Sequence, residues 1–273
     1  MEVRKKHKSF GGESVFASHS SHATSTTMSF SYFKPQEEVD SAIIWLSGLT
    51  CTEENFITKA GVQSLLAGTK TMIICPDTSP RGLDIEGADE SYDFGSGASF
   101  YVNATQAPYR ENYQMDDYIT KDIVSLIKEE FGIGKISIMG HSMGGHGALV
   151  LGLRNPEVFR CISAFSPIVN PMNCDWGKKA LKGYLGEDQS SWKEYDACEL
   201  IKSGKKHDQT ILIHQGLADE FYPSQLLTEN LEEFCKEAGQ ELQCQKREGY
   251  DHSYYFISTF LNDHIQHHLK YLK

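Results

Sequence analysis

The sequence predicts an α/β fold, in which a mostly parallel central sheet is covered by helices on both faces. Two observations predict it. Short segments rich in Ile, Val and Met alternate along the chain with longer segments of helical period. The 273 residues also fit the upper end of one domain, and no internal repeat, linker or low-complexity tract divides them. We therefore expect one domain over residues 1–273.

The expected elements follow from these patterns. The core strands are predicted at 42–48, 71–76, 135–140, 161–166 and 210–216. An antiparallel edge is predicted at 8–18 and 27–33, and one more strand at 241–247. Helices are predicted at about 56–67, 114–130, 143–154, 177–185, 225–238 and 254–270. Residues 77–113 are rich in Gly, Pro, Asp and Ser without a regular period, and so long an irregular segment is usually functional.

Composition excludes several classes of protein. The formal net charge of −11 disfavours nucleic-acid binding, and it means that an anionic substrate needs a local cation. The longest apolar runs are far shorter than a membrane span, and the basic amino terminus has no signal-peptide core behind it. Seven scattered cysteines without C-x-x-C spacing indicate free thiols. We expect a cytoplasmic protein without a metal or another cofactor.

The segment GHSMG at 140–144 fits the G-x-S-x-G motif. It lies between the predicted strand KISIM and the predicted helix GGHGALVLGLR, which is the context that the motif requires. Glycines permit the sharp turn that exposes the serine hydroxyl above the strand ends. The sequence therefore predicts the α/β-hydrolase fold, with Ser142 as the nucleophile of an acyl hydrolase.

A serine nucleophile needs a histidine base and a carboxylate that orients this base. In this fold the acid and the histidine follow the serine in that order. Asp219 follows the strand 210–216, and His252 lies between the strand 241–247 and the last helix. These two residues are the expected partners. The rival acids are Glu220 and Asp251.

Other histidines lie near the motif or show metal-ligand spacing. The rival bases are His214, His141 and His146, for which a core position or packing around the serine is the expectation. The helical spacing of His264, His267 and His268 would suit a metal, but we expect a solvated face near the end of the last helix.

Two backbone N–H groups must stabilise the oxyanion that forms when the serine attacks. The residue after the nucleophile, Met143, is the first expected donor. The second is Leu49, because Gly48 permits close approach of the loop 47–56. Cys51 follows two residues later. One interpretation is a buried, inert thiol, and the other is a thiol whose modification blocks the site without the thiol taking part in catalysis.

Eight segments in collinear order carry a family resemblance: WLSGLTCTEENF (45–56), PDTSPRG (76–82), GASFYVNATQAPY (97–109), GHSMGGHGAL (140–149), RNPEVF (154–159), FSPIVNPMNCDWGKKAL (165–181), QGLADEF (215–221) and EGYDHSYYFI (248–257). Together they resemble the S-formylglutathione hydrolase family, also called the esterase D family. The family's catalytic serine, aspartate and histidine fall on Ser142, Asp219 and His252, and its oxyanion donors on Leu49 and Met143. The stretch 30–44 looks shorter than the family's usual connection.

The resemblance implies that the chain hydrolyses S-formylglutathione to formate and glutathione, and that it forms a homodimer. A general short-chain carboxylesterase is the alternative, and a binding protein that has lost catalysis is a more distant one. A narrow acyl pocket is expected, with Trp176 and Tyr255 as its candidates. Lys178, Lys179 and Arg81 are the candidates for attracting the glutathione carboxylates.

Overall fold

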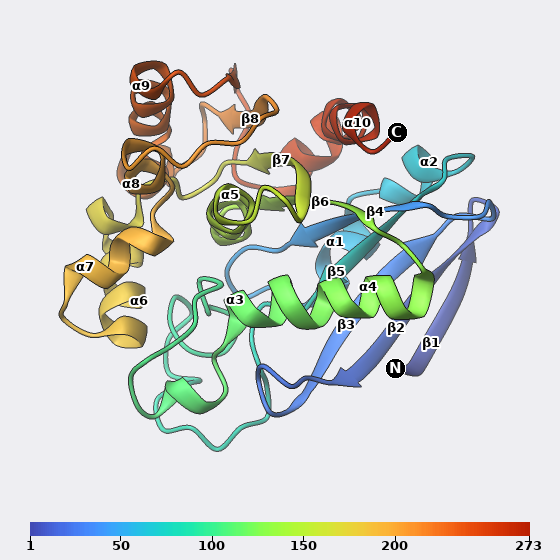
Figure 1. Cartoon of the computed structure of the whole chain (residues 1–273), viewed down its shortest axis with the longest axis horizontal. Coiled ribbons are helices and arrows are strands. Elements are labelled where there is room, and N and C mark those ends of the chain that lie inside the picture. The colour runs from blue at the N-terminus through green and yellow to red at the C-terminus, as the bar shows by residue number, and fades with distance from the viewer.

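The computed structural model describes residues 1–273 and contains one nine-stranded sheet in the order β1-β2-β3-β5-β4-β6-β7-β8-β9 (Figure 1). Neighbouring strands from β1 to β5 along this order are antiparallel, and those from β5 to β9 are parallel. The strands are β1 (Glu2–Ser9), β2 (Gly12–Ser20), β3 (Thr27–Lys34), β4 (Ser41–Leu46), β5 (Thr71–Pro76), β6 (Lys135–His141), β7 (Phe159–Phe165), β8 (Ile211–Gly216) and β9 (Leu242–Arg247). The predicted mostly parallel sheet is confirmed.

Helices cover both faces of this sheet (Figure 1). Along β4, the side chains of Ile43 and Trp45 pack against one helical layer, and those of Ile44 and Leu46 pack within the core of the other. The first layer consists of α1 (Glu53–Lys59), α2 (Val62–Leu66) and α10 (Tyr254–Tyr271). The second contains α3 (Met115–Asp117), α4 (Val124–Phe131), α5 (Met143–Arg154), α6 (Asp175–Leu185), α7 (Gln189–Trp192), α8 (Ala197–Lys202) and α9 (Thr228–Ala238). None of these helices has the length and apolarity needed to cross a membrane.

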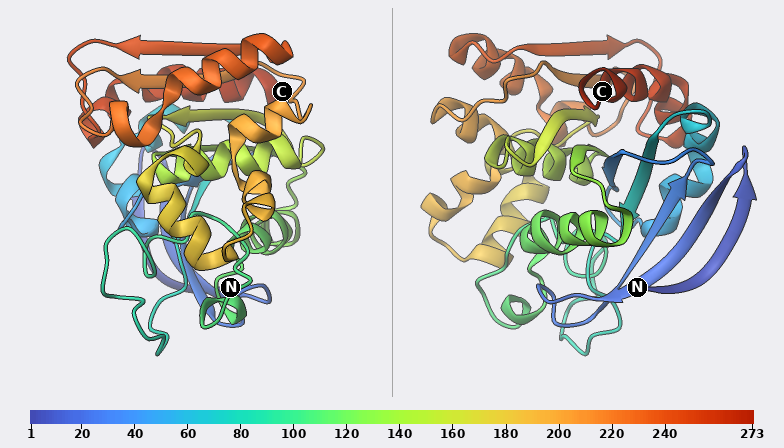
Figure 2. Two further views of the ribbon diagram at one scale, coloured as in Figure 1. Left: turned by 90° about the vertical axis from the view of Figure 1, so that its left-hand side faces the viewer. Right: turned by 45° about the vertical axis from the view of Figure 1, so that its right-hand side comes forward.

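The amino-terminal edge differs from the expectation. The segment 8–18, predicted as one strand, contains the turn between β1 and β2, where Phe10 and Gly11 have φ of 48° and 80°. Strand β1 was not predicted because almost all of its side chains are exposed, so its sequence has no apolar alternation. It forms the outer edge of the sheet (Figure 2). Strands β2 and β3 pair from Glu13 to Ser20, so the short connection 35–40 does not disturb the hairpin.

Several helices also have other bounds than predicted. The helix predicted at 56–67 is two helices, because the chain turns at Gly61 with a φ of 73°. The region predicted at 114–130 is helical but contains a π-helical turn at Tyr118–Ile123. A second π-helical turn, Tyr222–Leu226, precedes α9. Helices α7 and α8 were not predicted, because they are only four and six residues long.

The histidines of α10 contradict the expectation of a solvated face. His264 and His268 are fully buried, and His267 is half-buried. Both buried rings bond the hydroxyl of Ser163 on β7, through His264 Nδ1 at 2.8 Å and His268 Nε2 at 2.8 Å. His268 Nδ1 also bonds Ser137 on β6 at 2.7 Å. The prediction failed because serines in the strands give these rings neutral partners, and burial lowers the pKa of both histidines well below its usual value.

Candidate active site

Ser142 occupies a sharp turn between β6 and α5. Its φ of 58° and ψ of −119° are rare for a residue with a side chain, and its N–H donates to the carbonyl of Phe165 on β7 at 3.0 Å. Two glycines make room for the turn. A Cβ atom at Gly144 would lie 2.0 Å from the carbonyl oxygen of Leu46, and one at Gly140 would lie 2.2 Å from that of Gly144. The motif therefore specifies a backbone geometry that larger residues would prevent.

Asp219 and His252 form a hydrogen-bonded pair. Asp219 lies in the loop after β8 and His252 just before α10, and the distance from His252 Nδ1 to Asp219 Oδ2 is 2.5 Å. The N–H of Phe221 donates to the other carboxylate oxygen at 2.9 Å. Because Nδ1 donates to a carboxylate, the ring can present Nε2 as a proton acceptor. The sequence-predicted order of acid and base thus corresponds to a contact in space.

The rival acids lie elsewhere. Glu220 is exposed, although it adjoins Asp219 in the sequence. Asp251 is exposed too, and its carboxylate accepts hydrogen bonds from the N–H and the hydroxyl of Ser253, the N-cap residue of α10. Neither carboxylate bonds a histidine, so neither competes with Asp219 for orienting His252.

The rival bases have other partners. His146 Nε2 bonds the carbonyl of Phe100 at 2.9 Å. His214 Nδ1 bonds His264 Nε2 at 2.9 Å, and His214 Nε2 accepts from Arg247 at 2.8 Å. His141 is buried with its ring centre 4.4 Å from that of His252, and burial lowers its pKa well below the usual value. His141 therefore packs as a neutral ring beside the Asp219–His252 pair.

Ser142 and His252 line one cavity of about 280 Å³. Its walls are largely apolar and include Leu49, Tyr92 and Phe221 from the surrounding loops, Trp176 from the first turn of α6 and Tyr254 from the first turn of α10. A wider hollow of about 460 Å³ beside α9 and β9 is lined by neither serine nor histidine. No group of three or more His, Cys, Asp or Glu side chains is arranged to hold a metal ion. The cavity at Ser142 is thus lined by both the predicted nucleophile and the predicted base.

Of the two predictions for the acyl pocket, the one for Tyr255 is wrong. Trp176 lines the cavity, with its Nε1–H donating to the hydroxyl of Tyr92 at 3.2 Å. Tyr255, by contrast, is 84% exposed. Because Tyr255 lies in the first turn of α10, the helix directs it to solvent and brings Tyr254, its neighbour, to the cavity.

Two backbone donors lie beside Ser142. The N–H group of Leu49 donates to no other group in the protein. Leu49 lines the cavity, and Met143 begins α5, where N–H groups lack partners within the helix. A Cβ atom at Gly48 would lie only 3.1 Å from Ser142 Cβ, so the loop of Leu49 packs directly against the serine. The site thus offers free donors next to the hydroxyl.

Comparisons with known proteins show the family to which this chain belongs. The model of the "Esterase" family matches residues 21–267. The chain is 50% identical to the S-formylglutathione hydrolase of Rattus norvegicus, over 100% of this chain and 99% of the relative. It is 48% identical to the S-formylglutathione hydrolase of Arabidopsis thaliana, over 97% of this chain and 96% of the relative. The chain belongs to the S-formylglutathione hydrolase family of serine esterases. A solved S-formylglutathione hydrolase from Agrobacterium tumefaciens has a TM-score of 0.97, with 40% identity and both chains covered completely.

None of the three expected cations lines the cavity. Arg81 pairs with the buried carboxylate of Asp77, with 2.9 Å between Nε and Oδ2. Lys179 pairs with Asp93 at the surface. Lys178 is exposed and forms no ion pair, but it does not line the cavity. The sequence did not indicate Lys59, which does not line the cavity either but lies 5.4 Å above the ring of the cavity residue Tyr254 and forms no ion pair.

Cys51 lines the cavity, as its place in the sequence suggested. It is half-buried, and burial raises the pKa of its thiol although the charges of Lys59 and Arg81 oppose this effect. Its backbone carbonyl is the acceptor of two side-chain donors, which connect it to the end of β5. In this S-formylglutathione hydrolase family member, a cysteine therefore adjoins the predicted oxyanion loop.

Proposed function

We propose that the chain hydrolyses S-formylglutathione to formate and glutathione, and so removes formaldehyde that has been bound by glutathione. The observation that carries this proposal is the 2.5 Å hydrogen bond between Asp219 and His252 at the cavity of Ser142. Relatives named S-formylglutathione hydrolase are 50% and 48% identical to this chain over nearly its full length. This similarity supports the choice of substrate.

In the proposed first step, Ser142 Oγ attacks the formyl carbon while His252 Nε2 takes the hydroxyl proton. Asp219 stabilises the imidazolium that results, and the N–H groups of Leu49 and Met143 bind the oxyanion. The carbon–sulfur bond then breaks, glutathione leaves with the proton from His252, and the formyl group remains on Ser142. A thiolate is a good leaving group, so this protonation matters less than it does in amide cleavage.

In the second step, water attacks the formyl ester of Ser142. His252 takes one proton of this water as the new carbon–oxygen bond forms, and it returns the proton to Ser142 Oγ as the ester bond breaks. The products are formic acid and the free serine. The oxyanion of this step occupies the same position, so the same two N–H groups serve both steps.

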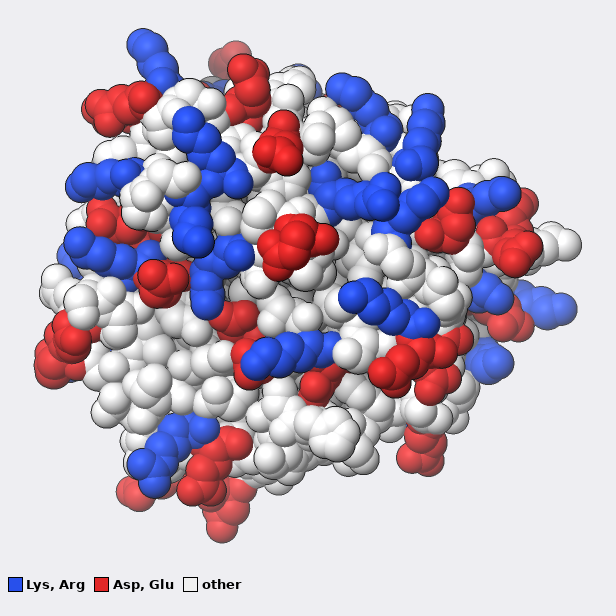
Figure 3. Space-filling model, in the orientation of Figure 1, with Lys and Arg blue, Asp and Glu red and all other residues white.

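We also propose that Lys59 binds a carboxylate of the glutathione moiety. Lys59 is exposed, has no acidic partner, and adjoins the cavity residues Tyr254 and Cys51. The formal net charge of −11 means that a local cation must attract the anionic substrate. On the face shown in Figure 3, basic and acidic side chains are interspersed. Lys59→Gln should raise KM for S-formylglutathione several-fold and leave a neutral ester unaffected, whereas Lys128→Gln on α4 should change neither.

The substrate is tested by comparing kcat/KM for S-formylglutathione with that for p-nitrophenyl acetate. We expect the thioester to be favoured by orders of magnitude. A general short-chain carboxylesterase is the second candidate, because a cavity of about 280 Å³ exceeds the volume of a formyl group. Equal values for the two substrates, or a preference for the oxygen ester, would favour this second function.

We further propose a cytoplasmic location and a homodimer. All seven cysteines are unpaired, which supports a reducing compartment. The homodimer rests on the family resemblance alone, and light scattering of the purified protein tests it, since a mass of 30.7 kDa would indicate a monomer.

A further inference from the structure

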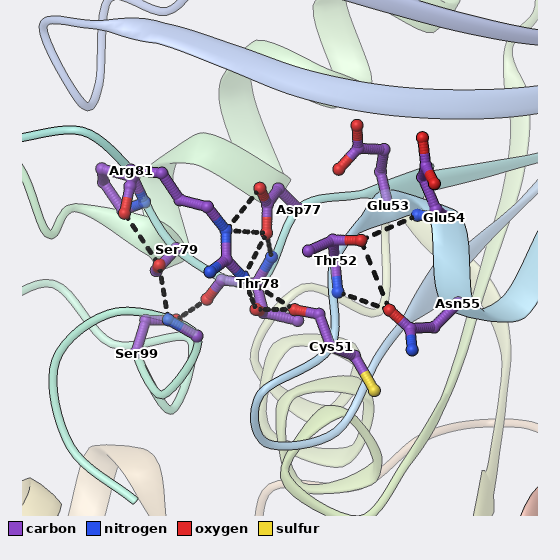
Figure 4. Close-up of polar contacts among 12 residues, drawn as sticks. Cys51, Thr52, Glu53, Glu54, Asn55, Asp77, Thr78, Ser79, Arg81 and Ser99 are labelled. Carbon is purple, nitrogen blue, oxygen red and sulfur yellow. Dashed lines mark hydrogen bonds and ion pairs between the residues drawn. The ribbon is translucent and has the colours of Figure 1, made fainter. Parts of the chain in front are cut away.

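The carbonyl oxygen of Cys51 accepts hydrogen bonds from two side chains (Figure 4). Arg81 Nη2 donates to it at 2.9 Å and Thr78 Oγ1 at 2.5 Å. Cys51 ends the short loop that begins at Gly48 and contains Leu49. This acceptor therefore ties the loop with the proposed oxyanion donor to residues that follow β5.

Arg81 is itself held in place. Its Nε lies 2.9 Å from Asp77 Oδ2, and its Nη2 lies 3.0 Å from Asp77 Oδ1. The side chain of Asp77 is 6% exposed, and its backbone N–H donates to Ser29 on β3 at 3.0 Å. A guanidinium held by two bonds to a buried carboxylate at a strand end has little freedom. Arg81 thus fixes the position of the Cys51 carbonyl relative to the end of strand β5.

The loop needs such external support. Thr50 has a φ of 66°, a left-handed conformation that is unfavourable for a β-branched residue. The N–H of Thr50 donates to the carbonyl of Gly97 at 2.9 Å, and the N–H of Gly97 donates to Ser79 Oγ at 2.8 Å. Contacts on both sides of Thr50 therefore hold a conformation that the loop does not favour by itself.

We propose that Arg81 is a positioning residue for catalysis, which acts through the carbonyl of Cys51 to hold the N–H of Leu49 toward the oxyanion. The proposal rests on the role given to Leu49 above. It replaces the expectation that Arg81 attracts a glutathione carboxylate, because Asp77 already offsets its charge and its guanidinium makes five hydrogen bonds within the protein.

The test compares Arg81→Met and Thr78→Val with the wild type on two substrates, S-formylglutathione and p-nitrophenyl acetate. Both variants should lower kcat more than they change KM, and by the same factor on both substrates, because both reactions form the oxyanion. We expect a loss of about 10- to 100-fold for Arg81→Met and a smaller loss for Thr78→Val, since a displacement of about 1 Å can cost ~10². Arg81→Lys should recover only part of the activity, because one ammonium cannot reproduce the bidentate geometry.

A structural role alone would give other results. Arg154→Met is the matched control, since Arg154 also pairs with a carboxylate that is 7% exposed, that of Asp116. This control should lose stability but keep kcat. Inhibition by a trifluoromethyl ketone, which forms an oxyanion adduct with a serine, should weaken in parallel with kcat in Arg81→Met and Thr78→Val.

Three outcomes would overturn the proposal: unchanged kcat in both variants, a rise in KM for S-formylglutathione alone, or weakened activity without weakened inhibition. If Arg81→Met fails to fold, the kinetics of Thr78→Val test the proposal, because this variant leaves the ion pair between Arg81 and Asp77 intact. A wild type that hydrolyses only the neutral ester would contradict the proposed substrate but leave this test valid on that ester.

Discussion

Replacing Gly48 with alanine should slow catalysis without unfolding the protein. The added methyl group would lie 3.1 Å from Ser142 Cβ and 3.3 Å from the carbonyl oxygen of His141, so the neighbours must yield by a few tenths of an ångström. Gly48 has no left-handed φ that alanine would disfavour. At ~10² in rate for a displacement of about 1 Å, such a shift should reduce kcat by roughly 3- to 10-fold.

The assay measures kcat on S-formylglutathione and the free energy of unfolding in urea for three glycine-to-alanine variants, in which the added methyl group is increasingly crowded. An added Cβ at Gly134 would meet no atom within 4 Å, so Gly134→Ala should retain full activity. At Gly144 it would lie 2.0 Å from the carbonyl of Leu46, so Gly144→Ala should lose the fold or nearly all activity. The activity of Gly48→Ala should lie between the activities of these two variants.

Full kcat in Gly48→Ala would refute this reasoning, because it would show that the loop of Leu49 is not in direct contact with the serine. A loss of stability equal to that of Gly144→Ala would refute it too. In that case Gly48 would serve the fold and not the placement of the donor.

The remaining predictions concern the acid, a thiol and the pH. Asp219→Asn should reduce kcat by on the order of 10³ or more while Glu220→Gln stays active, and the reverse result would assign the acid to Glu220. Cys51→Ser should remain active and resist a thiol reagent that inactivates the wild type, whereas Cys244→Ser should stay sensitive; equal inactivation of both would place the sensitive thiol elsewhere. Burial lowers the pKa of His146 to about 4, so the unfolded chain binds more protons as the pH falls below 6.5. Proton uptake by His146 in the unfolded chain should therefore contribute about 2 kcal/mol to the unfolding free energy lost between pH 7 and pH 5, and His146→Gln should remove this contribution while those of the other buried histidines remain; an unchanged pH dependence in that variant would contradict the reasoning.

The parts of the site that depend on local chemistry could be predicted from the sequence. The turn at Ser142 needs glycines at fixed offsets, so the motif and its flanking strand and helix predict it. Asp219 and His252 could be predicted because the ends of parallel strands meet at one edge of the sheet, and the structure brings these two side chains together.

The parts that depend on tertiary packing could not be predicted. Tyr254 and Tyr255 are identical in type and adjacent, and only the start of α10 determines which one reaches the cavity. His264 and His268 looked like surface residues because their partners on β6 and β7 lie more than 100 positions away in the sequence. Arg81 looked like a free cation because nothing in the sequence shows that Asp77, four residues earlier, is buried beside it.

The most direct test of the proposed function is the hydrolysis of S-formylglutathione by the purified wild type and by Ser142→Ala. We predict rapid release of glutathione by the wild type. The variant should retain the fold, because alanine fits the turn, and should show no turnover above a trace. Turnover by Ser142→Ala at a substantial fraction of the wild-type rate would contradict the assignment of Ser142 as the nucleophile, and with it the proposed mechanism.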